Sequence, residues 1–553
     1  MHERRRNFWG WGYEGEGPTR EQQERMAKTV GELFGTGPLA VADPPTIEDI
    51  ELRPPRLEPP TALAPSCRTD PYERAGHAYG KSFRDIVRGF RREYPDPPDV
   101  VAVPPDEAAV GAVLDWCEDV GAVAVPYGGG SSVVGGVECP TAHAGGRPVV
   151  TLDLRRLDQV VEIDRTSRAA RIQAGVYGPA LEDQLRPHGL TLRHFPQSFE
   201  LSTLGGWLAT RSGGHYATLY THIDDFVESV RAVTPHGVWE SARLPGSGAG
   251  PSPDRMLLGS EGILGVITEA WMRLQDRPTH RALATARFAD FDAGAAAARA
   301  LAQSGLHPSN CRLLDATEAL ITGTDDGTAA ILLVAFESAD HALDPWIARA
   351  VEIVRDHHGT VDDDAGRADT TGTDDDAHRD DAHRGDATAG AWRQAFLRAP
   401  YTRDALVAMG CVNETFETAI TWDRFDALYE DVMTTARTAV DEVCGTGVVT
   451  CRFTHVYPDG AAPYFTVIAP GRGGDRLAQW DEIKAAVSEV LVRHRATITH
   501  HHAVGRDHRA WYDRQRPAPF VDALRAAKAA LDPSSILNPG VLLDPIGPAR
   551  DVR

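Results

Sequence analysis

The sequence predicts a multidomain α+β protein, and three observations lead to this fold class. The chain has 553 residues, too many for one ordinary hydrophobic core, so it should divide into two or more domains. Residues 99–126 read as strand, helix and strand, and short β-rich segments follow them. In the second half, residues 279–305 read as a strand and then a helix, and residues 329–338 (AAILLVAFES) as a buried strand.

The strand–helix–strand unit is the clearest local pattern. DVVAVPP (99–105) predicts a short strand, DEAAVGAVLDWCEDVG (106–121) a helix, and AVAVP (122–126) a second strand. Apolar residues of the helix recur at the i, i+3, i+4, i+7 spacing of a single buried face. These residues are Val110, Val113, Leu114 and Cys117.

The residues before this unit are less regular. The first 95 or so are rich in Pro, Arg and Glu, and only REQQERMAKTVGELF (20–34) has a helical pattern. We therefore expect an arm that packs on the domains that follow.

The second predicted strand runs directly into the glycine-rich segment PYGGGSSVVGG (126–136). In a dinucleotide-binding Rossmann unit such a loop opens a helix. Here the loop runs instead into three β-rich segments, PVVTLDL, VVEIDR and AARIQAGV, so that unit is not predicted. Consecutive glycines and serines between strands can still bind phosphate through exposed N–H groups and hydroxyls. On its own, the loop is equally consistent with a tight β-turn.

Two more segments rich in small residues favour a ligand. Residues 194–225 contain Ser, Thr and Gly at high density and lead into a strand, turn and strand, FVESVRAVTPHGVWE. Residues 259–274 (GSEGILGVITEAWMRL) are a further glycine-punctuated loop before a β-rich run. Three such loops within about 140 residues predict one extended ligand that passes several backbone edges.

Composition excludes some functions. A net charge of −22 and a pI near 5.4 argue against nucleic acid, which needs a basic footprint. The seven cysteines form no CxxC pair, as expected for reduced intracellular thiols. No membrane-spanning apolar run is evident, and no apolar stretch follows the basic N-terminus, so neither a membrane span nor a secretory signal is predicted. We expect a cytoplasmic protein.

At this point the motifs carry a family resemblance. VPYGGGSSV, QSFELSTLGGWLATRSGG, VTPHGVWE and GSEGILGVITEA resemble the FAD-binding domain of the vanillyl-alcohol-oxidase type of flavoproteins. Within that superfamily, FWGWGYE, YTRDALVAMGCVNETFETAITWDR, CRFTHVYPDGAAPYF and THHHAVG resemble the alkyldihydroxyacetonephosphate synthase family. The resemblance spans nearly the whole chain, with gaps in the first 95 residues and around 360–390.

The resemblance implies an α+β fold with a PCMH-type FAD-binding domain of two subdomains. That domain would occupy residues 96–278, after the N-terminal arm of residues 1–95. An α+β cap domain with an antiparallel sheet, the FAD-linked oxidase C-terminal type, would occupy residues 279–553, and its last segment would pack back on the FAD domain. Within the cap, residues 361–390 are acidic and nearly free of large apolar residues, and we expect a solvated, flexible loop there.

FAD is the cofactor that the resemblance implies. The pyrophosphate would be held by the glycine loop, and the rest of FAD by the two later segments. The implied residues are Pro126, Tyr127, Gly128, Gly129, Gly130, Ser131 and Ser132; Gln197, Ser198, Phe199, Glu200, Leu201, Ser202 and Thr203; Thr210, Arg211, Ser212 and Gly213; and Glu261, Gly262, Ile263, Leu264, Gly265, Val266 and Ile267. Relatives that link FAD covalently through the first loop use a histidine, whereas Ser131 stands here, so the flavin should be bound non-covalently.

The catalytic residues implied by the resemblance are Tyr464, His500, His501 and His502. By pattern alone, Tyr464 in its apolar β-rich stretch could be a core tyrosine, and the three histidines could be a surface cluster. The resemblance makes the phenol a general acid and base facing the flavin, with imidazoles that assist proton transfer. If the histidine stretch is extended, alternate side chains face opposite ways, so the three should not share one metal ion. No metal is predicted.

Arg403 and Arg312 match family positions near the substrate and the flavin. A guanidinium suits phosphate because its fork of N–H donors can bind two oxygens at once. Without the resemblance, each would be read as a surface arginine.

The implied function is exchange of the acyl group of acyl-dihydroxyacetone phosphate for a fatty alcohol, a step of ether lipid synthesis without net oxidation. A proton would leave C1 of the substrate, flavin N5 would bond to that carbon as carboxylate departs, and the alcohol would then displace the flavin. The partner would be a small-molecule or lipid substrate and not nucleic acid; peripheral membrane association and a homodimer are compatible with it.

An FAD-linked dehydrogenase of D-2-hydroxy acids is the alternative, because LDPSSILNPGVLL resembles those enzymes. They typically carry HxGDGNxH and a later EHG. The corresponding segments here, THVYPDGAAPYF and HHHAVG, lack the second histidine and the glutamate. A flavin-binding protein without turnover is a third reading, and it leaves the tyrosine, histidines and arginines without a role.

Overall fold

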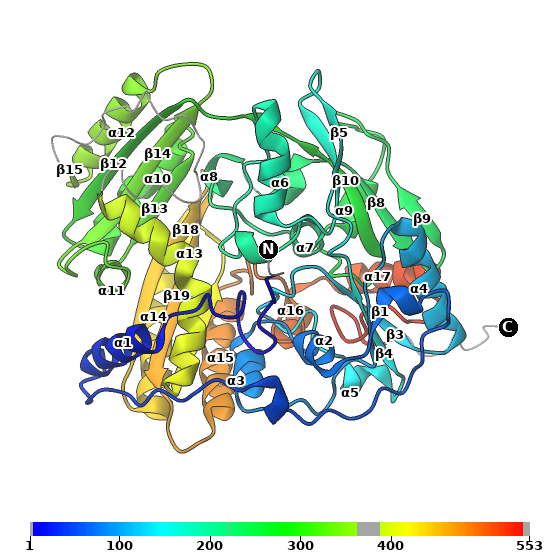
Figure 1. The fold of residues 1–553 in the computed structure, drawn as a ribbon. Helices are drawn as coiled ribbons and strands as arrows, with labels where there is room; N and C mark the ends of the chain where they lie inside the picture. The colour runs from blue at the N-terminus through cyan, green and yellow to red at the C-terminus, as the bar shows by residue number, and fades with distance from the viewer. Residues whose placement is uncertain (1–3, 221, 362–386, 546–553) are drawn as a thin grey trace.

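The computed structural model describes residues 4–220, 222–361 and 387–545. It shows two lobes side by side, one built on two small sheets and the other on one large sheet (Figure 1). The flexible loop expected at 361–390 lies largely outside the described residues.

The first sheet of the smaller-sheet lobe has the strand order β1-β2-β4-β3. Its strands are β1 (Cys67–Arg68), β2 (Val100–Ala102), β4 (Val149–Asp153) and β3 (Val123–Tyr127). The pairs β2–β4 and β4–β3 are parallel, and α4 (Glu107–Asp119) connects β2 to β3. The predicted strand–helix–strand unit is thereby confirmed, with Val110, Val113, Leu114 and Cys117 buried in the core.

The second sheet of this lobe is antiparallel, in the order β5-β6-β10-β8-β9. Its strands are β5 (Val160–Asp164), β6 (Ala169–Gln173), β10 (Val266–Arg273), β8 (Val227–Thr234) and β9 (Gly237–Glu240). A two-stranded ribbon, β7 (Leu190–Thr191) with β11 (Gln275–Asp276), lies at its margin. The helices of this region are α5 (Thr141–Ala144), α6 (Gly178–Leu185), α7 (Leu204–Thr210), α8 (Ala217–Tyr220) and α9 (Pro253–Leu257). The glycine loop leads to the four-residue α5 and then to β4, so no dinucleotide-binding helix follows it.

The other lobe, which we call the cap, contains an antiparallel sheet in the order β15-β12-β14-β13-β18-β19-β16, with β17 paired to β19. Its strands are β12 (His280–Phe288), β13 (Asn310–Leu314), β14 (Ala330–Ser338), β15 (Thr360–Val361), β16 (Cys411–Glu417), β17 (Ile420–Thr421), β18 (Val448–Val456) and β19 (Gly460–Pro470). Its helices are α10 (Phe291–Gln303), α11 (Ala316–Ile321), α12 (Asp344–Asp356), α13 (Ala387–Ala408), α14 (Trp422–Cys444) and α15 (Arg476–Arg493).

Helices cover both faces of the cap sheet. On β14, Leu332 and Val334 belong to the large core that includes α10, α12, α14 and α15. Ile331 and Leu333, which point to the other face, pack with residues of α11 and α13. The predicted buried strand is confirmed, and its continuous apolar run reflects burial on both faces.

The N-terminal residues contain α1 (Arg20–Leu33), as predicted, and two short helices that the sequence analysis missed, α2 (Pro71–Gly76) and α3 (Phe83–Phe90). A capping box between Ser82 and Asp85 starts α3, and this S-x-x-D pattern is the local signal that could have revealed it. Four side chains of α3 join the cap core, so this helix ties the arm to the cap.

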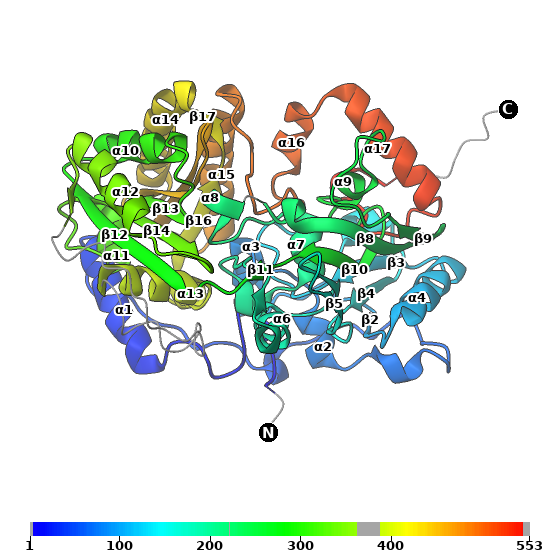
Figure 2. The ribbon, with the colours of Figure 1, turned by 90° about the horizontal axis from the view of Figure 1, so that it is seen from above.

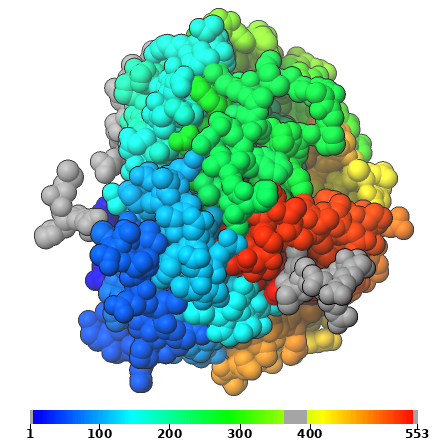
Figure 3. All heavy atoms as spheres, turned by 90° about the vertical axis from the view of Figure 1, so that its right-hand side faces the viewer, coloured from blue at the N-terminus to red at the C-terminus, as the bar shows by residue number. Residues whose placement is uncertain are grey.

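The C-terminal segment returns to the smaller-sheet lobe. After α16 (Arg509–Gln515) and α17 (Ala518–Leu531), residues 536–538 lie beside β3, where Ala124 N donates to the carbonyl of Ile536 and Asn538 N donates to the carbonyl of Ala124. Figure 2 shows α17 above the sheets of this lobe, and Figure 3 shows the red C-terminal region against the blue and cyan N-terminal half. Among the described residues, no helix is long and apolar enough to cross a membrane.

Candidate active site

A cavity of about 350 Å³ lies where the two lobes meet. The smaller-sheet lobe contributes the glycine loop and parts of residues 196–214, and the cap contributes α13 and the strands β13, β16, β18 and β19. Predicted site residues on its wall are Gly128, Gly129, Gly130, Ser131, Ser132, Gln197, Ser198, Ser202, Thr210, Ser212, Gly213, Arg312, Arg403, Tyr464, His501 and His502. The structure thus brings the candidate cofactor loops and the candidate catalytic residues to one space.

The glycine loop has the properties of an anion cradle. Within the described chain, none of the backbone N–H groups of residues 128–132 donates a hydrogen bond to the protein. Bare backbone is required here, because a Cβ at Gly129 would lie 2.1 Å from the carbonyl oxygen of Leu201, and Gly130 has φ +65°. Unpaired N–H groups at a cavity wall fit the pyrophosphate of FAD.

The other predicted cofactor residues lie in and around this wall. Phe199 and Leu201 are buried in the core, Thr203 caps α7, and Glu200 is exposed. Tyr127 donates from its hydroxyl to the carbonyl of Gly76. Arg211 pairs with Asp224 at 2.9 Å, outside the cavity wall.

Residues 261–267 do not line the cavity. The Glu261 carboxylate accepts hydrogen bonds from the backbone N–H of Val504 (2.9 Å) and Gly505 (2.8 Å), and Gly262 lies against Pro126. The segment then continues into β10. It supports the glycine loop and the C-terminal region, and direct contact of these residues with FAD stays a prediction.

Tyr464 lies on β19 and faces the cavity with 5% of its surface exposed. The Arg452 guanidinium carbon lies 4.0 Å from the centre of the Tyr464 ring, and Arg452 is held by Glu318 at 2.5 Å. The His501 ring lies 6.1 Å from the Tyr464 ring at an interplanar angle of 18°. The phenol therefore has a buried cation over its face and an imidazole alongside it.

The three predicted histidines form a bend and not an extended strand. The backbone N–H groups of His500, His501 and His502 all donate to the carboxylate of Glu417, at 2.6, 3.0 and 2.9 Å. Burial alone would raise the pKa of Glu417, but the adjacent His501 and His502 hold it well below its usual value. Burial lowers the pKa values of His500 and His502 well below the ordinary range. Only His501 and His502 line the cavity, whereas His500 contacts Tyr457 (3.0 Å) and His222 (3.1 Å).

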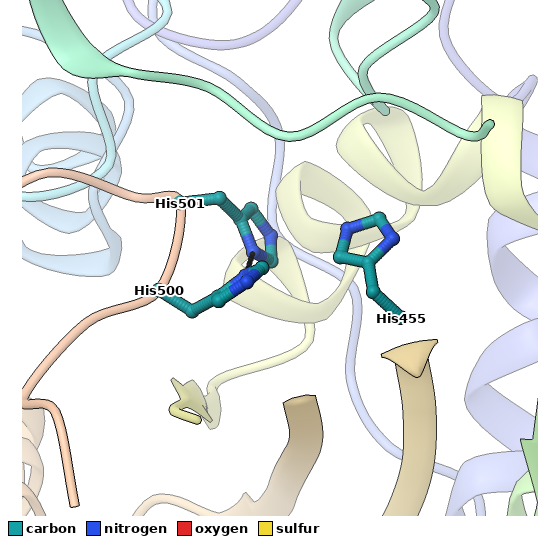
Figure 4. A group of neighbouring side chains, drawn as sticks. All are labelled: His455, His500 and His501. Carbon is teal, nitrogen blue, oxygen red and sulfur yellow. Dashed lines mark hydrogen bonds between the residues drawn. The ribbon is translucent and has the colours of Figure 1, made fainter. Parts of the chain in front are cut away.

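His455, which the sequence analysis did not select, lines the cavity from β18. It faces His500 and His501 across a short gap (Figure 4), and one ring nitrogen from each of the three lies within 4.8 Å of the others, so this group could hold a metal ion. His502 is not part of it. His500 and His501 already face each other through their Nδ1 atoms at 3.2 Å, while both ring nitrogens of the buried His455 lack a protein partner in the described chain.

The two predicted arginines line the cavity from two different elements of the cap, α13 and β13. Arg403 on α13 donates from Nε to Asn413 Oδ1 at 3.2 Å. Arg312 on β13 is fully buried, and burial together with nearby Arg452 lowers its pKa well below the usual value. Buried Arg312 and its neighbour Arg452 both line the cavity, and two guanidinium groups there favour an anionic ligand.

Comparison with known proteins agrees with this site. The family described as "FAD binding domain" matches residues 98–243, and the family described as "FAD linked oxidases, C-terminal domain" matches residues 277–542. Together with the glycine cradle, these matches define an FAD-dependent enzyme of the FAD-linked oxidase class, which confirms the expected fold class and cofactor.

Within that class the chain is a homologue of the alkyldihydroxyacetonephosphate synthases, as the sequence motifs indicated. It is 29% identical over 514 residues to the synthase of Trypanosoma brucei brucei, covering 88% of this chain and 82% of the relative. It is 29% identical over 525 residues to that of Dictyostelium discoideum, covering 90% and 83%. A solved alkyldihydroxyacetonephosphate synthase structure superposes with a TM-score of 0.78 at 24% identity, covering 97% of this chain and 98% of the other.

Proposed function

We propose that this protein replaces the acyl group of acyl-dihydroxyacetone phosphate with a fatty alcohol, in a reaction of ether lipid synthesis. The observation that carries the proposal is the shared cavity, which joins a backbone cradle for FAD to Tyr464, His501, the buried Arg312 and the half-buried Arg403. The homologous synthases, which align over more than four-fifths of the chain, support the substrate class.

The Oη atom of Tyr464 would act as the general base that takes the proton from C1 of the substrate, and as the general acid that returns it. Negative charge that develops on this oxygen would be stabilised by the Arg452 guanidinium over the ring, and Glu318 keeps that guanidinium in place. His501, stacked beside the phenol, is positioned to pass the proton on. Bound FAD would supply a covalent handle and an electron reservoir at its N5 atom, so the exchange needs no external oxidant.

Arg403 would bind the phosphate of the substrate. It lies on the cavity wall on α13, and its Nε bond to Asn413 fixes the guanidinium plane. Apolar side chains of the same wall, among them Phe396, Leu406 and Ile468, offer a surface for a hydrocarbon chain.

The direct test uses the purified flavoprotein without an electron acceptor. It is incubated anaerobically with acyl-dihydroxyacetone phosphate and a long-chain alcohol, and the ether product and released fatty acid are measured by mass spectrometry. Equal amounts of ether and fatty acid establish the exchange. If no ether forms and D-2-hydroxy acids bleach the flavin, the protein is an FAD-linked dehydrogenase of D-2-hydroxy acids and the proposed exchange is wrong.

Cellular location and self-association stay predictions. A cytoplasmic protein that works at a membrane surface is expected to remain in the supernatant at high salt and to bind vesicles that contain the fatty alcohol. Light scattering of the purified protein distinguishes a monomer from a homodimer.

A further inference from the structure

We infer that Glu417 is a positioning residue, which holds the loop of His500, His501 and His502 in register with Tyr464. The inference rests on the proposed function, because it assigns Glu417 a part in the same proton transfer. Glu417 lies within the segment YTRDALVAMGCVNETFETAITWDR, but neither the resemblance nor the comparisons assign it a role.

The first step is the placement of Glu417. It is the last residue of β16, and it stands directly opposite Tyr464 on β19 in the antiparallel pairing. Only 3% of its surface is exposed. The strand that carries the phenol and the strand that carries the carboxylate therefore form one rigid ladder at the cavity wall.

The second step is the number of donors that meet this carboxylate. Oε2 accepts from the N–H groups of His500 and His501, and Oε1 accepts from the N–H of His502 and from the hydroxyl of Thr499. Three successive N–H groups around one anion form a nest. Within the described chain, these are the hydrogen bonds that the three backbone N–H groups make, apart from a second contact of His502 N with Thr499 Oγ1.

The third step links the nest to the rings. His501 Nδ1 lies 3.2 Å from Glu417 Oε2, and His502 Nδ1 lies 3.7 Å from Oε1. A carboxylate beside a ring nitrogen fixes the tautomer and the orientation of an imidazole. Glu417 thus sets both the backbone of the loop and the face that His501 turns toward Tyr464.

The chemistry requires a carboxylate of this length. A glutamine at this position has one accepting oxygen and an NH₂ group that would face N–H donors, so at least one buried donor would be left unpaired. An aspartate keeps the charge but is one methylene shorter, so it can satisfy only part of the nest.

The test compares Glu417→Gln and Glu417→Asp with the parent protein, each full-length and loaded with FAD. In Glu417→Gln we expect FAD to remain bound, kcat for ether formation to fall about 10–100-fold, and KM to change less than about 3-fold. Glu417→Asp should recover part of kcat. Hydrogen exchange followed by mass spectrometry should show faster exchange in peptides covering residues 499–503, with the β19 peptides unchanged.

Glu182→Gln is the matched control. Glu182 is also a buried carboxylate that accepts a backbone N–H, from Leu192 at 3.0 Å, but it does not line the cavity. Loss of the Glu182 carboxylate should lower the stability of the protein, but kcat of the folded Glu182→Gln variant should equal that of the parent. A near-normal kcat in Glu417→Gln, or unchanged exchange in residues 499–503, would overturn the inference. If the parent protein makes no ether, the proposed function has failed, and the exchange data alone then decide whether Glu417 anchors the loop.

Discussion

Glu417 on β16 and Tyr464 on β19 stand directly opposite each other in the antiparallel pair. The loop of His500–His502 is folded around the Glu417 carboxylate. The His501 ring of this loop stacks beside the Tyr464 phenol. Tyr464 therefore lies on the cap sheet, and the histidine loop, which follows it by more than 30 residues, is anchored to the neighbouring strand through Glu417. Rigid mounting of this kind favours precise proton transfer.

Tyr464→Phe tests the phenol directly. The substitution removes only the hydroxyl, so the fold and FAD binding should be kept, while turnover should fall about 10²–10⁴-fold because general acid–base catalysis is lost. Ether formation and flavin absorbance of the same preparation measure the two effects.

Tyr429→Phe is the control for this substitution. Tyr429 lies on α14 and stacks on Phe291 at 4.9 Å, in the cap core away from the cavity. The Tyr429→Phe variant should form ether at the same rate as the parent protein. A near-normal rate in Tyr464→Phe would remove the phenol from the mechanism.

Arg403→Ala tests the phosphate subsite. Because a buried or half-buried guanidinium–phosphate contact is a strong charge-assisted bond, KM for the phosphorylated substrate should rise about 10–100-fold, corresponding to roughly 1.4–2.8 kcal/mol, with little change in flavin content. Arg437→Ala, on the exposed side of α14, should leave KM unchanged. If both variants bind phosphorylated and unphosphorylated substrates as the parent does, Arg403 does not bind the phosphate.

The sequence was sufficient for the strands around the glycine loop, because period-2 and period-3.6 patterns are local signals. It could not place His455. Strict alternation from Arg452 and Thr454, both on the cavity wall, would turn His455 to the opposite face of β18, but a register shift between Phe453 and His455 turns it into the cavity as well. Bulges of this kind leave little trace in one sequence.

Glu417 escaped the sequence analysis for a different reason. In VNETFETA it is one of two glutamates on a strand, and nothing local shows that its partners lie more than 80 residues later. The same holds for Arg452 and Glu318, whose ion pair joins β18 to α11. Long-range pairs of this kind follow from the packing of the sheet and not from a motif.

Non-covalent FAD is a separate prediction from Ser131 in the glycine loop. Precipitation of the yellow protein with acid should release all the flavin into the supernatant, and the mass of the denatured chain should equal that of the polypeptide alone. Ser131 lines the cavity, so Ser131→Ala should weaken FAD binding without changing this outcome. A chain that retains flavin after denaturation would contradict the prediction.

Metal content tests the group of His455, His500 and His501. We keep the expectation that no metal is needed, because His500 and His501 are already hydrogen-bonded to each other and to Tyr457 or Glu417. The protein purified without a histidine tag should contain much less than one equivalent of zinc, manganese or iron, and a chelator should leave its rate unchanged. One equivalent of metal that is lost together with activity, and lost again in His455→Asn, would establish a metal site instead.

Glu261 predicts a pH dependence of stability. Burial raises the pKa of its carboxyl to about 7, in spite of the hydrogen bonds from Val504 and Gly505, whereas in an unfolded chain the value is about 4.3. Between these two values the folded protein keeps a proton that the unfolded chain has lost, so stability falls as the pH rises through this window. The full effect is at most about 4 kcal/mol.

Glu261→Gln should remove this contribution. The difference in urea midpoint between the FAD-loaded parent and the variant is measured at pH 5, 6, 7 and 8, so that other groups titrating in both proteins cancel. We expect the parent to lose stability relative to Glu261→Gln from pH 5 to pH 7, and the difference to stay constant above that. Glu58→Gln, at an exposed position of the N-terminal arm, should show no such trend. A pH-independent difference for Glu261→Gln would mean that the buried carboxyl is ionised throughout this range.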